Sequence, residues 1–200
     1  MKIGAVLFDM DGTLVDSHGA IIRSWTRISE EYGLPLDDIL AVHAGRPAWS
    51  TLESVAPWLG AEKIARAGAR QLEWEYDDLE DVVAIDGALE LIEGVTARNL
   101  PWAVVTSADE RLARARLGAA GIEPPLLIST DDITNPKPDP EGYLLAAERL
   151  GVPPADCLVV EDAPAGVAAG RAAGMRVVGV AGITGDSTVT NLVEILALLS

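Results

Sequence analysis

The stretch "VLFDMDGTLVDS", Val6–Ser17, decides the fold of this 200-residue chain. It begins inside the continuous apolar run "IGAVLF" (3–8), which is typical of a strand covered on both faces of a parallel sheet. Three acids follow, at Asp9, Asp11 and Asp16. A carboxylate at the edge of a core loses hydration, so it must be paired, hydrogen-bonded or bound to a metal. Because packing alone gives no reason for acids here, we expect them to serve chemistry.

Four more apolar runs of the same kind follow later in the chain. They are "WAVVT" (102–106), "LLIST" (126–130), "CLVV" (157–160) and "RVVGV" (176–180). Helical patterns lie between or before them, at 107–121, 139–151 and 163–174. This alternation of strands and helices predicts an α/β fold with a doubly wound, Rossmann-like parallel sheet.

Two of these helices carry capping signals. Ser107 and Glu110 have the spacing of a capping box, which predicts that the first helix begins there. Asp139 is predicted to cap the second helix, with Pro140 at its first position and Gly151 just beyond its end.

The segment 17–85 breaks this alternation. It lacks a β-branched run, and its pattern predicts helices over 19–33, 36–44, 48–59 and 61–80, separated by glycine and proline. We therefore predict a small helical cap domain at 17–85, inserted after the first strand, and a Rossmann-like catalytic core made of 1–16 and 86–200. Four tryptophans, at 25, 49, 58 and 74, are expected to form the core of this cap, with one or two walling a pocket.

The composition narrows the class of protein. The chain has 31 acids against 15 bases, a formal charge of −16, which repels nucleic acid and anionic membranes, so neither is expected as a partner. No pattern indicates an obligate protein partner. Cys157 is the single cysteine and lies in an apolar run, which predicts a buried structural thiol. The N-terminal segment resembles neither a signal peptide nor a membrane span, so we expect a cytoplasmic protein.

Polar residues follow the carboxyl ends of four predicted strands, where ligands bind in an open α/β sheet. They are Asp9 and Asp11, then Thr106 and Ser107, then Lys137, and finally Glu161 and Asp162. Taken alone, each has a simpler role: Ser107 and Asp162 can cap helices, and Lys137 can be an exposed loop residue. Because the strand ends meet at one edge of the sheet, we interpret the group as one site.

Phosphoryl transfer is the chemistry that uses such a group, since it depends mostly on positioning and charge neutralisation. Asp9 and Asp162 offer the oxygen ligands that Mg²⁺ prefers, and Glu161 can help directly or through water. Thr106, Lys137 and main-chain N–H groups can hold the phosphate oxygens.

Two of the acids can then perform the reaction. Asp9 can attack phosphorus as a carboxylate, which gives an aspartyl-phosphate. Asp11 can protonate the leaving oxygen, provided that a cover over the site removes water and keeps the acid protonated.

The motifs "DMDGTLVDS", "VVTS", "KPDP" and "VVEDAPAG", in that order, resemble the haloacid dehalogenase superfamily of phosphatases, over nearly the whole chain. The resemblance implies a Rossmann-like core, a helical cap between the first two motifs, and an aspartyl-phosphate mechanism with Mg²⁺. It also implies that Asp9 is the nucleophile and Asp11 the general acid/base. The implied phosphate-binding residues are Thr106 and Lys137, and the implied metal ligands are Asp9, the main-chain carbonyl of Asp11, and Asp162, with Glu161 beside them.

Within the superfamily, the region from "KPDPEGYLL" to "GRAAGM" and the stretch "HAGRPAWSTL" are similar to small sugar and polyol phosphatases, such as those acting on 2-deoxyglucose 6-phosphate or glycerol 3-phosphate. Arg46 matches a cap arginine that meets substrate in some relatives, and its fork suits a phosphate or a hydroxyl, although a surface role is an equal alternative. Arg46 and Ser107 are therefore the candidate substrate-binding residues. Our primary hypothesis is a Mg²⁺-dependent phosphatase acting on a small phosphorylated sugar or polyol.

Two alternatives remain open. A phosphosugar mutase similar to β-phosphoglucomutase shares these motifs, but the cap histidine of that enzyme falls at Ile21 here, and His18 is out of register. A non-catalytic binding or regulatory protein on the same fold is disfavoured, because every motif residue is intact. A dehalogenase proper would lack the second aspartate, Asp11.

Overall fold

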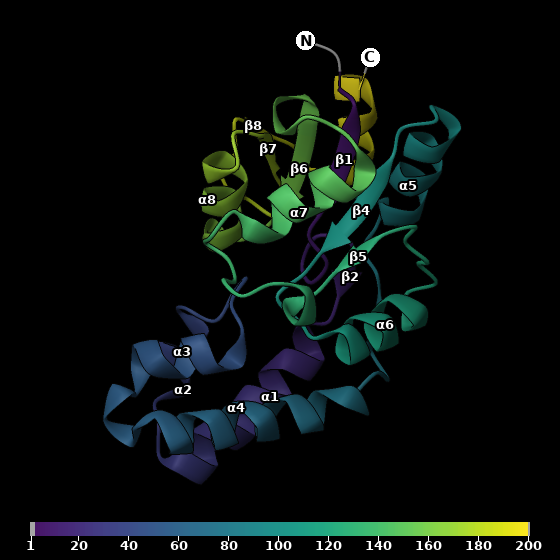
Figure 1. Ribbon diagram of the computed structural model, residues 1–200. Coiled ribbons are helices and arrows are strands. Elements are labelled where there is room, and N and C mark those ends of the chain that lie inside the picture. The colour runs from purple at the N-terminus through teal and green to yellow at the C-terminus, as the bar shows by residue number, and fades with distance from the viewer. Residues whose placement is uncertain (1–2, 200) are drawn as a thin grey trace.

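The computed structural model describes residues 3–199, and its centre is a six-stranded sheet in which every neighbouring pair of strands is parallel (Figure 1). The strand order is β5-β4-β1-β6-β7-β8. The strands are β1 Ala5–Phe8, β4 Trp102–Val105, β5 Leu127–Ile128, β6 Cys157–Glu161, β7 Arg176–Gly179 and β8 Ser187–Thr188. The predicted α/β fold with a parallel sheet is confirmed, and all five predicted strands are present.

Helices cover both faces of the sheet, which explains why its strands are continuously apolar (Figure 1). One layer contains α5 Ala88–Ala97, α6 Glu110–Ala119 and the 3-10 helix Leu192–Leu199, and the other contains α7 Glu141–Leu150 and α8 Pro164–Ala172. Along β1, Val6 and Phe8 pack into the first layer, whereas Ala5 and Leu7 pack into the second. This central strand is therefore buried on both sides, and it places the residue after Phe8 at the carboxyl edge of the sheet.

The start of α6 differs from the prediction. The helix begins at Glu110 and is capped by Asp109, whose carboxylate accepts a hydrogen bond from the Leu112 N–H at 2.8 Å. The predicted capping box of Ser107 and Glu110 is therefore wrong, because the chain needs two more residues to leave β4 before the helix begins. Ser107 is left free for other contacts.

The start of α7 lies one residue later than predicted. Pro140 precedes the helix rather than opening it, and the Asp139 carboxylate accepts a hydrogen bond from the Glu141 N–H at 3.0 Å. The end of the helix is as predicted, because Gly151 adopts a left-handed conformation with φ 69°.

Three short strands were not predicted. β8 lies at the sheet edge, and β2 (Val15–Asp16) pairs antiparallel with β3 (Val83–Ala84). Each is two residues long, which is too short to leave a periodic pattern in the sequence. The β2–β3 pair lies where the chain leaves and re-enters the sheet domain, so it joins the two connections into one structural unit.

The helices between β2 and β3 pack around a hydrophobic cluster of their own, set apart from the sheet (Figure 1). These helices are α1 His18–Tyr32, α2 Leu36–Leu40, α3 Ala48–Val55, α4 Ala61–Tyr76 and a 3-10 turn, Pro57–Leu59. The cluster includes Trp25, Ile28, Ile39, Leu52 and Ile64. This separate core supports the division into a cap at 17–85 and a core at 1–16 and 86–200, which stays a prediction.

The tryptophans of the cap do not share one role. Trp25 is buried in the cap cluster, and Trp74 packs against its edge with the guanidinium groups of Arg27 and Arg70 over its ring. Trp49 and Trp58 are 45% and 71% exposed. Trp25 and Trp49 also line the cavity described below, as predicted for one or two of them. The prediction that the tryptophans form the core of the cap is wrong for Trp58, which is mostly exposed.

Cys157 is buried and unpaired at the start of β6, as predicted. Burial raises the pKa of its thiol to about 11, which makes the thiol a poor nucleophile. Within residues 3–199, no helix is both long enough and apolar enough to cross a membrane.

Candidate active site

The predicted site residues are positioned by the carboxyl ends of neighbouring parallel strands. Asp9 follows β1, whose register places Phe8 beside Val104 of β4 and Val160 of β6. Thr106 and Glu161 lie at the ends of those two flanking strands. The sheet therefore brings together groups that are separated by about 150 positions in the sequence, as the strand-end argument predicted.

Lys137 is the centre of a buried polar cluster. Its ammonium group donates to Asp9 Oδ1 at 2.5 Å, to Glu161 Oε1 at 2.7 Å and to the Val105 carbonyl at 3.0 Å. Burial alone would lower the pKa of Lys137, but the carboxylates of Asp9 and Glu161 outweigh burial and raise the pKa well above its usual value. Lys137 is therefore a permanent cation with all three protons used, and the reading of it as an exposed loop residue is wrong.

Glu161 is fully buried, and contacts from three sides hold its carboxylate. One oxygen accepts from Lys137 and from the Tyr143 hydroxyl at 2.9 Å, and the other accepts from the Ala163 N–H at 3.0 Å. A Cβ atom at Gly166 would overlap this carboxylate, so only glycine leaves room for it under the first turn of α8. Glu161 is thus held in place by the protein and supports Lys137.

Three carboxylates crowd the floor of the site. Single oxygen atoms of Asp9, Glu161 and Asp162 lie within 4.8 Å of one another. Burial, followed by the charge of Glu161, raises the pKa of Asp162 to about 7 and the pKa of Asp9 well above its usual range. Gly12 (φ 84°) permits this crowding, because a Cβ there would overlap the Asp162 carboxylate. An oxygen-only donor set with excess negative charge suits a hard divalent cation such as Mg²⁺.

Asp11 lies beside this cluster and is held by two donors. Its Oδ1 accepts from the Ser17 hydroxyl at 2.6 Å and from Arg116 Nη1 at 3.0 Å. Arg116 comes from α6 and also forms an ion pair with Glu75 of α4, with 3.2 Å between Nη2 and Oε2. Asp11 is thereby linked to both the core and the cap.

Arg116 and Glu75 were missed by the sequence analysis. Arg116 is only 2% exposed, although an arginine in a helix ordinarily faces solvent. The signal was present in the spacing, because Arg116 continues the buried stripe of α6 formed by Leu112, Ala113 and Leu117. A charged residue on such a stripe indicates a buried ionic partner.

Thr106 and Ser107 occupy the end of β4. Thr106 is buried, and its hydroxyl accepts from the Ala108 N–H at 3.1 Å, which leaves the hydroxyl proton free for another acceptor. The Ser107 hydroxyl instead donates to the main-chain carbonyl of Gly45 in the cap, at 2.9 Å. Arg46 follows Gly45, so this contact anchors the cap arginine next to the carboxyl edge of the sheet.

A cavity of about 450 Å³ lies between the cap and the core. Its walls contain all the predicted site residues except Lys137 and Glu161, which lie beneath the floor. The core supplies Asp9, Asp11, Thr106, Ser107, Arg116 and Asp162, and the cap supplies His18, Ile21, Arg46, Trp49, Gln71 and Glu75. The cavity can hold a small molecule with one end at the carboxylates and the other against the cap.

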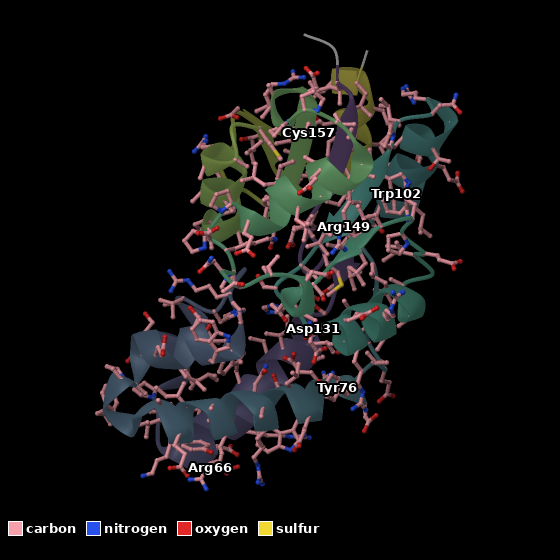
Figure 2. All side chains as sticks on the ribbon, in the orientation of Figure 1. Arg66, Tyr76, Trp102, Asp131, Arg149 and Cys157 are labelled. Atoms are coloured by element: carbon pink, nitrogen blue, oxygen red, sulfur yellow. The ribbon has the colours of Figure 1, made fainter. Side chains whose placement is uncertain are left out.

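Polar contacts hold the cap over this cavity. The Tyr76 hydroxyl, at the end of α4, donates to the Asp109 carboxylate at the start of α6. In Figure 2, Tyr76 lies on the side of the cap toward the core, whereas Arg66 of the same helix lies on the far side. Together with the Arg116–Glu75 pair, this contact ties α4 to α6.

Comparisons with known proteins agree with this geometry. Residues 3–174 match the family model described as haloacid dehalogenase-like hydrolase. Hexitol phosphatase A of Escherichia coli (strain K12) is 38% identical over 90% of this chain and 84% of that protein. Validoxylamine A 7'-phosphate phosphatase of Streptomyces hygroscopicus subsp. limoneus is 37% identical over 86% of this chain and 83% of that protein.

Solved structures share the fold. The crystal structure of a hydrolase from Pseudomonas syringae matches with a TM-score of 0.88 at 24% identity, over 98% of this chain and 97% of that one. The predicted class, a phosphoric monoester hydrolase with a capped Rossmann-like fold, is confirmed. Since the family model matches most of the sequence and named relatives exceed 30% identity, the chain belongs to the haloacid dehalogenase-like hydrolase family.

Proposed function

We propose that this chain is a Mg²⁺-dependent phosphatase that hydrolyses a small phosphorylated sugar or polyol through an aspartyl-phosphate formed on Asp9. The observation that carries the proposal is the Asp9 carboxylate itself, which opens on the cavity while Lys137 holds one of its oxygens from below at 2.5 Å. This contact fixes the direction of the carboxylate and offsets its charge, so that an anionic phosphate can approach.

In the first half of the reaction, an Asp9 oxygen forms a bond to phosphorus while the bond from phosphorus to the substrate oxygen breaks. Asp11 gives its proton to the leaving alkoxide. In the second half, Asp11 takes a proton from water, which attacks phosphorus and releases inorganic phosphate and free Asp9. The Ser17 hydroxyl and Arg116 hold Asp11 beside the cavity for both steps.

The phosphate group is held by the end of β4 and attracted by the charge of the buried lysine. Thr106 has a hydroxyl proton free to donate to a phosphate oxygen, and Lys137 contributes its charge from below. Ser107 is tied to Gly45, so its role toward phosphate would be carried by the main-chain N–H, with the side chain holding the cap.

Asp9, Asp162 and the main-chain carbonyl of Asp11 are the proposed ligands of Mg²⁺. When bound, Mg²⁺ neutralises the charge that develops on the transferring phosphoryl group. Glu161 lies close enough to join, but its oxygens already accept three hydrogen bonds. We therefore assign Glu161 to the support of Lys137, with any contact to the metal made through water.

The proposed substrate class rests on the relatives and on the cavity. Two relatives are named as phosphatases of a hexitol and of validoxylamine A 7'-phosphate. A cavity of about 450 Å³ suits a substrate of this small size. The rival mutase is disfavoured, because Ile21 stands at the sequence position of the mutase's cap histidine. His18 and His43 also line the cavity, so the assay below includes a test for isomerisation.

A phosphate-release assay on p-nitrophenyl phosphate and glucitol 6-phosphate, with Mg²⁺ and with EDTA, tests the proposal. We expect release from both substrates only with Mg²⁺, and none from Asp9→Asn, since an amide cannot attack phosphorus. Asp38→Asn is the matched control, because it makes the same substitution at an exposed acid that does not line the cavity, and it should stay active. Activity of a folded Asp9→Asn protein would refute the nucleophile. Isomerisation that requires a bisphosphate would favour the mutase, and no turnover at all would favour the binding protein.

A further inference from the structure

Arg116 presents unused hydrogen-bond donors in the wall of the cavity. Its Nη1 binds Asp11, and its Nη2 forms an ion pair with Glu75 at 3.2 Å without hydrogen-bond geometry. Neither Nη2 nor Nε has a hydrogen-bond partner among residues 3–199, although the side chain is nearly fully buried. A buried donor without a partner is costly, so few native side chains keep two of them. Because Arg116 lines the cavity, a ligand there can satisfy them.

An acceptor lies next to these donors. Glu75 is buried, and its Oε1 accepts from the Ser24 hydroxyl at 2.7 Å and from Gln71 Nε2 at 2.6 Å. Its Oε2 faces Arg116 Nη2 at 3.2 Å. Glu75 and Gln71 both line the cavity, so the same wall offers donors and an acceptor side by side.

The charge of this wall is unfavourable for an anion. The guanidinium of Arg116 is shared by Asp11 and Glu75. With Asp11 protonated as the general acid, the charge of Arg116 is balanced by Glu75, so this wall has no net positive charge. Arg46 also lines the cavity, and the main chain next to it is held at the core, where Gly45 contacts Ser107 and Ala163. An anionic group next to Arg116 would therefore meet the Glu75 carboxylate, while the charge of Arg116 is already balanced.

We propose that Arg116 and Glu75 recognise an uncharged, hydroxyl-bearing end of the substrate and exclude substrates that carry a second anionic group. A hydroxyl can accept from Arg116 and donate to Glu75 at once, whereas a carboxylate or a second phosphate can only accept. The inference rests on the proposed phosphatase function and adds the residues that select among phosphate esters.

Two substrates that differ only at the far end test the inference. Glucitol 6-phosphate ends in a CH₂OH group, and 6-phosphogluconate ends in a carboxylate on an otherwise matched chain. For the wild-type protein with Mg²⁺, we expect kcat/KM to favour glucitol 6-phosphate by about 100-fold or more, because like charges are brought together and a hydroxyl contact is lost.

Glu75→Gln isolates the role of charge. The amide keeps the shape of Glu75 and one acceptor oxygen for Ser24 and Gln71, but it replaces the other oxygen by a donor and removes the negative charge. The preference should therefore fall by about tenfold or more. Glu73→Gln is the matched control, since it removes an exposed acid from the same helix and should leave the preference unchanged. The preference is a ratio of two substrates, so a general loss of activity through poorer packing does not move it.

Arg116→Met provides a second variant, which should lower kcat/KM for glucitol 6-phosphate more than for p-nitrophenyl phosphate. Three outcomes would overturn the inference while the phosphatase proposal stands. The wild-type protein could show no preference between the two substrates, or Glu75→Gln could leave the preference unchanged. The wild-type protein could also hydrolyse p-nitrophenyl phosphate but not glucitol 6-phosphate. A wild-type protein that releases no phosphate from p-nitrophenyl phosphate would overturn the phosphatase proposal itself.

Discussion

The crowded carboxylates predict an unusual dependence of stability on pH. In the folded chain without metal, the pKa of Asp162 is about 7, against an ordinary value of 3.8. A carboxyl whose folded pKa is raised contributes stability that is fully present below pH 3.8 and is lost as the pH rises through about 7. The metal-free protein should therefore become less stable between about pH 5 and about pH 8, a range over which many proteins change little.

The size of the loss of stability follows from the difference between the folded and unfolded pKa of Asp162. Each unit of pKa difference is worth about 1.36 kcal/mol, so Asp162 alone should lower the free energy of unfolding by about 3 kcal/mol from pH 5 to pH 8. For a chain of this length, that corresponds to a fall in Tm of roughly 6–12 °C. The raised pKa of Asp9 acts in the same direction. Lys137 stays charged over this range because its pKa is raised, so it does not oppose the trend.

Mg²⁺ should reverse this behaviour. A cation bound by Asp9 and Asp162 stabilises their ionised forms, so its binding competes with protons and is strongest at high pH. Thermal unfolding followed by circular dichroism, in EDTA and in excess Mg²⁺ at both pH values, measures the effect. We expect Mg²⁺ to raise Tm more at pH 8 than at pH 5, and Asp162→Asn to lose most of the pH dependence and of the response to Mg²⁺. If Tm in EDTA rises from pH 5 to pH 8, or if Mg²⁺ raises Tm equally at the two pH values, then the crowded carboxylates do not have raised pKa values as described.

Three further predictions concern catalysis. Asp11→Asn should slow hydrolysis of a sugar phosphate more than hydrolysis of p-nitrophenyl phosphate, because an aryl leaving group needs little protonation; equal losses in kcat would argue against a general acid. Ca²⁺ should inhibit in competition with Mg²⁺, since its larger coordination number would engage both oxygens of Asp9, and undiminished phosphate release with Ca²⁺ alone would contradict this. Arg46→Ala should raise KM for a phosphosugar or phosphopolyol about tenfold and affect p-nitrophenyl phosphate little, with Arg66→Ala on the far side of the cap as the control (Figure 2).

The sequence predicts this fold well where an element is long and buried on both sides. β1, β4, β6 and β7 are continuous apolar runs because helices cover both faces, and that pattern is visible without any structure. β8 was not predicted, because both of its residues are exposed at the sheet edge and leave no apolar run in the sequence. The start of α6 was misplaced because local spacing favoured Ser107, whereas the path out of β4 selects Asp109 as the cap.

The candidate site, too, could be predicted from the sequence only in part. Asp9, Thr106 and Asp162 could be predicted as neighbours, because parallel topology alone carries strand ends to one edge. The pairing of Glu75 with Arg116 could not, because it depends on how the cap packs over the core, where the β2–β3 pair and the contact of Tyr76 with Asp109 also join distant parts of the chain. Local periodicity can show that Arg116 is buried, but its partner belongs to the other domain. Substrate selection by such a pair is therefore encoded in the placement of the cap, whereas the chemistry is encoded in the motifs that follow the strands.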